Sequence, residues 1–171
     1  MPQFSANSDL RVDIVEHVDL SVIIPVYNLQ DYITETLESV IRQRHGASIE
    51  ILVIDDNSDD ATVELATHMA GQDNRIRLLT NVRKRGAAGC RNTGILEARG
   101  NWIIFLDGDD LLLEDSIKCR LDAVDNDPDI DLISGGFIRW HWEEDWSESS
   151  LENTPLADFL SCSAFPTILE K

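Results

Sequence analysis

Two clusters of acidic residues are the part of this sequence best suited to chemistry: Asp55-Asp56-Asn57-Ser58 and Asp107-Gly108-Asp109-Asp110. Carboxylates this close together raise each other's pKa and repel unless a cation lies between them. A hard divalent ion such as Mg2+ or Mn2+ takes oxygen ligands and keeps waters or substrate phosphates in its remaining positions. Asp107 and Asp109 therefore predict a metal that holds a diphosphate. Either cluster alone is also compatible with a polar turn after a strand.

A basic, glycine-containing segment lies between the two clusters. Residues 83–92 read RKRGAAGCRN and hold four of the chain's 14 lysines and arginines. Glycine lets the backbone approach a ligand closely, and arginine offers a rigid fork for phosphate oxygens. The segment also opens a predicted helix, whose N-terminus favours anions. It therefore predicts a loop that faces phosphate, with a solvated flexible loop as the alternative.

Other signatures of catalysis or nucleotide binding are missing. There is no Walker A pattern, and no GxGxxG follows the first predicted strand, which disfavours an NAD-dependent oxidoreductase domain. The histidines show no ligand spacing. Cys90 lies beside cations that could lower its pKa, but without a partner histidine a packed small side chain is the favoured role. Trp140, Trp142 and Trp146 could stack on a sugar ring or form a local hydrophobic cluster.

The elements that would position these residues alternate between strands and helices. Short β-branched and apolar runs predict strands at 20–26, 49–54, 75–79, 101–106 and 131–138. Apolar residues at helical spacing predict helices at 31–44, 61–70, 89–98 and 114–126. Asp59 or Asp60 is available as the N-cap of the second helix. This alternation predicts an α/β fold with a Rossmann-like, mainly parallel sheet and helices on both faces.

In such a sheet, ligands bind at the carboxyl ends of the strands. The two acidic clusters each follow a predicted strand, and Pro25-Val26-Tyr27-Asn28 forms a third strand end. We therefore expect all three segments to meet at one edge. The final segment, 165–171, reads like the approach to another strand.

Composition excludes several classes of function. The 171 residues are about one domain's worth, and the net charge of −18 argues against a nucleic-acid-binding surface. No apolar run is long enough to cross a membrane, and no secretory signal is visible. Three cysteines without a CxxC pattern favour a reducing, cytoplasmic location. The acidity is compatible with an ordinary acidic protein or with adaptation to high salt.

The chain resembles the inverting family 2 glycosyltransferases of the GT-A fold. The resemblance rests on LSVIIPVYN at 20–28, ILVIDDNSDDAT at 51–62, GAAGCRNTGILEARGNWIIFLDGDDLL at 86–112 and PDIDLISGGF at 128–137. It implies a nucleotide-sugar-binding domain at 20–139. Residues 1–19 would be a partly ordered leader, and 140–171 the truncated start of an acceptor-side region.

The resemblance implies a nucleotide-diphosphate sugar as donor, most often a UDP-sugar, and transfer to an acceptor hydroxyl with inversion. Tyr27 would stack on the base, and Asp56 would accept a hydrogen bond from its imide edge with Asp55 in support. Pro25 and Asn28 would belong to the same binding set.

The resemblance also implies how the diphosphate is held. Arg91 would lie near the diphosphate or the donor, with Asn92 beside it. Asp107 would approach the ribose or the metal shell, and Asp109 would ligate Mn2+ or Mg2+. The ion would act as a Lewis acid for the leaving diphosphate.

An inverting transferase also needs a general base for the acceptor hydroxyl. In the family this carboxylate lies in the acceptor-binding half, and none of Asp145, Glu148 or Asp158 lies in a matching motif, so the catalytic base is unassigned. We expect a fragment of a longer enzyme. The alternative is a non-catalytic nucleotide-sugar-binding module that needs a partner or a missing segment. The acceptor (a glycan, a lipid-linked sugar or a protein), homo-oligomerisation and peripheral attachment to the inner face of a membrane stay open.

Overall fold

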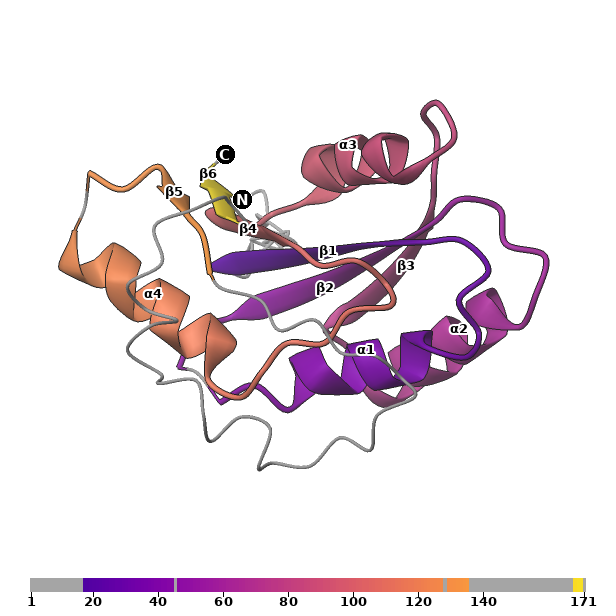
Figure 1. The fold of residues 1–171 in the computed structure, drawn as a ribbon, viewed down its shortest axis with the longest axis horizontal. Helices are drawn as coiled ribbons and strands as arrows, with labels where there is room; N and C mark the ends of the chain where they lie inside the picture. The colour runs from indigo at the N-terminus through magenta and orange to yellow at the C-terminus, as the bar shows by residue number, and fades with distance from the viewer. Residues whose placement is uncertain (1–16, 45, 128, 136–167, 171) are drawn as a thin grey trace, which may run out of the picture.

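The computed structural model describes residues 17–44, 46–127, 129–135 and 168–170. A six-stranded sheet in the order β3-β2-β1-β4-β6-β5 forms its centre (Figure 1). The strands are β1 (Leu20–Val26), β2 (Ile49–Asp55), β3 (Ile76–Thr80), β4 (Trp102–Phe105), β5 (Leu132–Ile133) and β6 (Ile168–Glu170). The first four pair in parallel, whereas β6 runs antiparallel to both β4 and β5.

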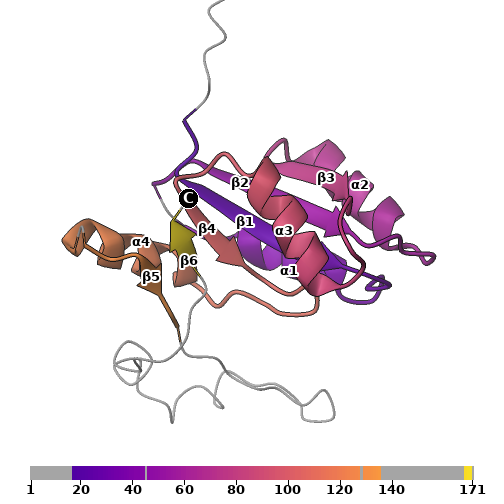
Figure 2. The same ribbon diagram turned by 90° about the horizontal axis from the view of Figure 1, so that it is seen from above.

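Helices cover both faces of this sheet. They are α1 (Ile33–Ile41), α2 (Thr62–Gln72), α3 (Ala87–Glu97) and α4 (Ser116–Asn126). Helix α3 lies over one face, and α1 and α2 lie on the other (Figures 1 and 2). The predicted α/β fold with a mainly parallel sheet and helices on both faces is therefore confirmed.

The two faces of the sheet bury two separate hydrophobic layers. Val22 and Ile24 of β1 pack with the core formed by α1 and α2, whereas Ile23 packs with Cys90 of α3. All three β1 residues are fully buried. Burial on both faces explains why the strand reads as a continuous apolar run instead of an alternating one. Helix α3 can pack this closely against β1 because residue 94 is glycine. A Cβ at Gly94 would lie 2.4 Å from Cγ2 of Ile23.

Element boundaries differ from the predictions by a few residues. Within the described part of the predicted strand at 131–138, residues Leu132–Ile133 form β5, and residues 136–138 lie outside the described residues. The N-cap position of α2 is Ala61, so the prediction of Asp59 or Asp60 there is wrong. Asp60 instead accepts hydrogen bonds from the backbone N–H of Thr62 at 2.9 Å and of Gln30 at 3.1 Å. It thereby joins the start of α2 to the loop after β1.

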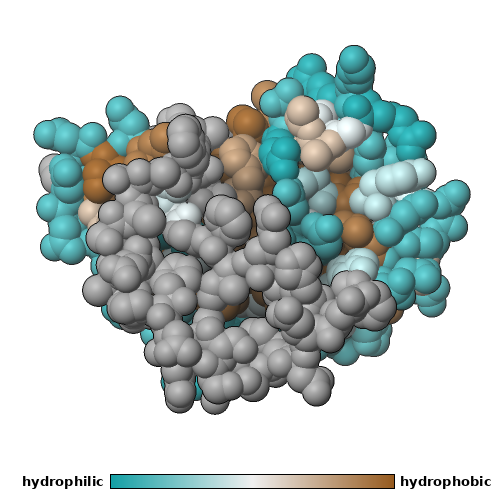
Figure 3. Space-filling model, viewed as in Figure 1, coloured by the Kyte–Doolittle hydropathy of each residue, from teal (hydrophilic) through white to brown (hydrophobic). Residues whose placement is uncertain are grey.

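Figure 3 shows a hydrophilic surface over α2 and the loops beside it. Apolar side chains reach the surface near β5, where Leu132 is 47% exposed. Within the described ranges, no helix has the length and apolar character that a membrane span requires. The tryptophans at 140, 142 and 146 and residues 1–16 of the predicted leader at 1–19 lie outside these ranges.

Candidate functional site

The carboxyl ends of β1, β2 and β4 meet at one edge of the sheet, as their parallel pairing requires. A cleft of about 310 Å³ opens there. Its lining residues are Pro25, Val26, Tyr27, Leu29, Asp56, Gly86, Ala87, Cys90, Asp107, Gly108 and Asp109. The structure therefore brings predicted site residues from all three strand ends into one cleft.

Asp56 is the most constrained acid of the cleft. It is only 5% exposed, yet both carboxylate oxygens have protein partners. Oδ1 accepts a hydrogen bond from Nδ2 of Asn81 at 2.6 Å, and Oδ2 accepts one from the backbone N–H of Gly86 at 2.7 Å. The bond from Asn81 lowers the pKa of Asp56 most. Burial opposes this, Gly86 and Arg85 add to it, and the pKa lies below its usual value.

Asp55 and Asn28 do not line the cleft, although both were predicted as binding residues. The Asp55 carboxylate closes the turn after β2 by accepting from the backbone N–H of Asn57 at 3.0 Å and of Ser58 at 3.1 Å. Asn28 has a φ of +52° and pairs with Asp59, its Nδ2 donating to Oδ1 at 2.6 Å. Both residues therefore fix the loops that flank the cleft.

Tyr27 lines the cleft and is 48% exposed. The guanidinium carbon of Arg85 lies 5.0 Å from the ring centroid, a cation–π distance. Arg85 also donates to the carbonyl oxygen of Asp56 at 3.3 Å. The basic segment thus approaches the edge where the base was predicted to bind.

Helix α1 holds the acidic loop after β4. The hydroxyl of Thr36 donates to the carbonyl oxygen of Gly108 at 2.8 Å, and the hydroxyl of Ser39 accepts from the backbone N–H of Leu112 at 3.0 Å. A side chain at Gly108 would be crowded, because a Cβ there would lie 2.8 Å from Cγ1 of Val26 and 3.0 Å from the backbone carbonyl oxygen of Pro25. The loop is therefore fixed from behind while its carboxylates face solvent.

Asp107 and Asp109 are both exposed at the mouth of the cleft. The guanidinium of Arg91 on α3 forms an ion pair with Asp107, which links the basic segment to the acidic loop. Partial desolvation, followed by the charges of Asp109 and Asp107, raises the pKa of Asp110. Among the described residues, no group of three or more His, Cys, Asp or Glu could hold a metal on its own. This edge can supply one or two carboxylate ligands and leave the other positions to a ligand or water.

Cys90 faces the cleft from α3, but it is buried and belongs to the core. Burial, and then the charges of Asp56 and Asp55, raise the pKa of its thiol to about 11, against a smaller lowering by Arg91. The idea that neighbouring cations lower this pKa is wrong, because desolvation and two carboxylates outweigh one cation. The packed role favoured from the sequence fits the structure.

Asn81 is a site residue that the sequence analysis missed. It directly follows β3, so its backbone N–H donates to the carbonyl oxygen of Asp55 at 2.8 Å and extends the β2–β3 ladder by one residue. This places its side chain beside Asp56. The signal was available, because the strand-end rule applied to the third predicted strand points to residues 80 and 81.

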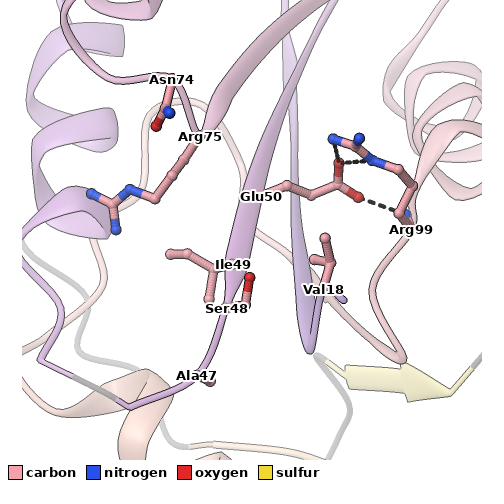
Figure 4. A pocket seen from close by; sticks show the side chains of 8 residues that line it. All are labelled: Val18, Ala47, Ser48, Ile49, Glu50, Asn74, Arg75 and Arg99. Atoms are coloured by element: carbon pink, nitrogen blue, oxygen red, sulfur yellow. Dashed lines mark hydrogen bonds and ion pairs between the residues drawn. The ribbon is translucent and has the colours of Figure 1, made fainter. Parts of the chain in front are cut away.

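A second hollow, of about 210 Å³, lies at the opposite edge, where the strands begin. Figure 4 shows the Glu50 carboxylate in its wall, bound by the side chain and backbone of Arg99. Glu50 is 3% exposed and also accepts from Ser21 at 2.7 Å and from Arg77 at 3.0 Å. The other guanidinium at this hollow, Arg75, is paired with Asp73. The carboxylates and guanidiniums at this hollow are therefore paired with one another, and they stabilise the fold.

Comparison with known proteins identifies the family. Residues 21–163 match the sequence profile of glycosyl transferase family 2, and the chain belongs to that family. It is 35% identical over 121 residues to the glycosyltransferase GlyG of Streptococcus pneumoniae serotype 4, covering 71% of this chain and 40% of GlyG. It is 39% identical over 102 residues to an Escherichia coli enzyme named UDP-Glc:alpha-D-GlcNAc-diphosphoundecaprenol beta-1,3-glucosyltransferase WfgD, covering 60% of this chain and 39% of WfgD.

Solved structures agree with this assignment. Crystal structures of S. aureus TarS 1–349 with UDP and with UDP-GlcNAc match with TM-scores of 0.62 and 0.60 and identities of 26% and 25%. Each match covers 72% of this chain and 38% or 37% of TarS 1–349. A Pyrobaculum calidifontis mannosyltransferase, crystallised with GDP-Man and Mn2+, matches in fold with a TM-score of 0.63, an identity of 24% and coverage of 72% and 37%. The chain thus spans about 40% of the length of these relatives.

Proposed function

We propose that this chain is the donor-binding part of a glycosyltransferase that uses a UDP-sugar, a divalent cation and an acceptor hydroxyl. The observation that supports this best is the convergence of Tyr27, Asp56 and the Asp107–Asp109 loop on one cleft of a family 2 chain. The sugar would transfer with inversion: its bond to the diphosphate breaks as the acceptor oxygen bonds to the anomeric carbon.

The base would be recognised at the β1–β2 side of the cleft. Tyr27 offers an exposed ring face for stacking, and Asp56 is an ionised acceptor suited to an imide N–H. Uracil has such an N–H, whereas the corresponding ring nitrogen of cytosine is an acceptor. The names of WfgD and of the TarS complexes support a uridine-based donor.

The diphosphate would be held at the β4 side. Asp107 and Asp109, a DxD pattern, offer hard oxygen ligands that suit Mg2+ or Mn2+, and fewer than three protein ligands leaves room for diphosphate oxygens. When bound, the cation supplies Lewis-acid stabilisation of the charge that develops on the leaving diphosphate. Arg91 would orient the diphosphate from α3 while keeping Asp107 in place.

The acceptor side is proposed to lie C-terminal to residue 139, beyond the nucleotide-sugar-binding domain at 20–139. Asp145, Glu148 and Asp158 fall outside the described residues, and no general base is assigned. Two free thiols, Cys90 and Cys119, support a reducing, cytoplasmic location.

Calorimetry with nucleotides tests the proposal. The 171-residue chain should bind UDP in the presence of Mn2+ and lose most of this affinity in EDTA. Asp109→Ala should abolish the metal-dependent part, whereas Asp125→Ala, an exposed acid on α4, should not change it. UDP binding that is indifferent to EDTA and to Asp109→Ala would contradict the metal role.

A second readout separates an enzyme from a binding module. A transferase should release UDP from a UDP-sugar once an acceptor, or the remainder of a longer chain, is supplied. Donor binding without any consumption under those conditions would favour the non-catalytic module.

A further inference from the structure

We propose that Asn81 is a positioning residue for nucleobase selection, acting through Asp56; this inference rests on the proposed function. Asn81 has no place at the cleft surface, since it is only 9% exposed and does not line the cleft. Its side chain instead holds the one carboxylate that faces the predicted base.

The four contacts of the Asn81 side chain use both ends of its amide. Nδ2 donates to Oδ1 of Asp56 at 2.6 Å and to the carbonyl oxygen of Lys84 at 3.3 Å. Oδ1 accepts from the backbone N–H of Arg83 at 2.9 Å and from the hydroxyl of Thr93 at 2.9 Å. The reverse amide orientation would set an oxygen against two acceptors, so the partners fix the direction of the side chain.

These contacts join three parts of the site. Asp56 follows β2, Arg83 and Lys84 belong to the loop after β3, and Thr93 lies on α3. Gly86 of the same loop donates to the other oxygen of Asp56 at 2.7 Å. The carboxylate is thus held at both oxygens, and its direction depends on the Nδ2 donor of Asn81.

A fixed, ionised acceptor discriminates between bases by whether they offer an N–H there. A base that lacks this proton leaves a buried carboxylate facing another acceptor, which costs binding free energy. If Asp56 turned or took up a proton, it could no longer make this distinction. Asn81 therefore sets selectivity without touching the base.

The test compares UDP with its N3-methyl analogue, which lacks the imide proton, by calorimetry in Mn2+. In the 171-residue wild-type chain, UDP should bind about tenfold or more tightly than the analogue. Asn81→Asp keeps the size and the acceptor oxygen but places an oxygen against Asp56, and the ratio should fall to about twofold or less at neutral pH. The matched control Asn74→Asp, at the opposite edge of the sheet, should keep the wild-type ratio.

The pH dependence of this ratio distinguishes positioning from a general structural role. At mildly acidic pH the introduced carboxyl is protonated and can donate to Asp56 as the amide does, so selectivity should return. Asn81→Ala offers no donor at any pH and should stay unselective throughout. The charged and titratable groups around Asp56 are Arg85, Asp55 and Cys90, with Asp107 and Asp109 across the cleft, and they are the same in every variant.

The outcomes separate the inference from the function that it deepens. Wild-type selectivity that persists in Asn81→Asp at neutral pH overturns the role of Asn81 and leaves UDP binding intact. Loss of selectivity that acid does not restore in Asn81→Asp also overturns it. Wild-type chain that binds neither nucleotide overturns the proposed function and this inference together. Should the variants not fold, NMR of the wild-type chain provides the test. The resonance of the Asn81 side-chain NH2 group must shift more on addition of UDP than on addition of the analogue. Equal shifts overturn the inference.

Discussion

Arg85 places its guanidinium over the ring of Tyr27, 5.0 Å from the centroid, although 58 positions separate the two residues in the chain. The same guanidinium lies 3.9 Å from Oδ2 of Asp56. Among the described cations of the basic segment, Arg85 alone contacts both Tyr27 and Asp56, the residues predicted to bind the base.

Replacement of Arg85 tests whether this contact helps nucleotide binding. Arg85→Met removes the charge but keeps much of the side-chain length, and the Kd for UDP should rise about two- to fivefold, the equivalent of about 0.5–1 kcal/mol. Arg83→Met removes an exposed cation of the same loop whose side chain, unlike that of Arg85, contacts neither Tyr27 nor Asp56, and it should have a smaller effect. Tighter UDP binding by Arg85→Met would mean that Arg85 competes with the base for Tyr27.

Tyr27 should contribute through stacking and not through its hydroxyl. Tyr27→Ala is expected to weaken UDP binding by about 1–3 kcal/mol, the range for base–aromatic stacking in nucleic-acid complexes. Tyr27→Phe should retain most of the affinity. Tyr32→Ala is the matched control, because Tyr32 is 53% exposed and does not line the cleft. Equal calorimetric affinities for all three variants would remove Tyr27 from the base site.

Glu50 should make the fold sensitive to acid. Burial raises the pKa of this carboxyl, but hydrogen bonds from the Arg99 backbone, Ser21 and the guanidiniums of Arg99 and Arg77 outweigh it, and the net pKa is lowered. The native state therefore binds this proton less readily than the unfolded state. The stabilisation is complete above the pKa of the unfolded chain and is lost as pH falls through the native value.

Glu50→Gln removes the contribution of this carboxyl group to the pH dependence of stability. It should lower the free energy of unfolding at neutral pH by about 1–3 kcal/mol, since charged hydrogen bonds are replaced by neutral ones. Urea denaturation should also show a shallower loss of stability on acidification than in the wild type. Glu97→Gln is the control, as Glu97 is half exposed and paired only with Arg77 among the described residues. Parallel pH profiles for Glu50→Gln and the wild type would contradict this account.

The strand ends of the cleft could be predicted because their position depends only on local pattern and on the parallel sheet. Asp56, Asp107 and Asp109 each follow an apolar run, and parallel strands must bring their carboxyl ends to one edge. The roles of Asn28 and Asp55 could not be predicted this way. Whether a polar side chain at a strand end faces a ligand or closes a turn depends on backbone angles such as the φ of +52° at Asn28.

Contacts across elements were harder still to predict. Glu50 reads as one polar residue in an apolar strand, and its partners become neighbours only through sheet register, which pairs it with Ser21. The contact of Arg85 with Tyr27 depends on the path of the loop between β3 and α3. That path requires a φ of +110° at Gly86 and close backbone packing at Gly89, where a Cβ would lie 1.8 Å from the carbonyl oxygen of Lys84.

Cys90 should be chemically inert in the folded protein despite its place at the cleft. With a pKa of about 11, roughly one thiol in ten thousand is ionised at pH 7, and the side chain is 1% exposed. In a variant with serine at positions 119 and 162, iodoacetamide should label Cys90 only after denaturation. The same reagent should label a variant that retains Cys119 alone, because this thiol is exposed. Rapid native labelling of Cys90 would show that α3 opens from the sheet, and protection by UDP would then locate that opening at the nucleotide site.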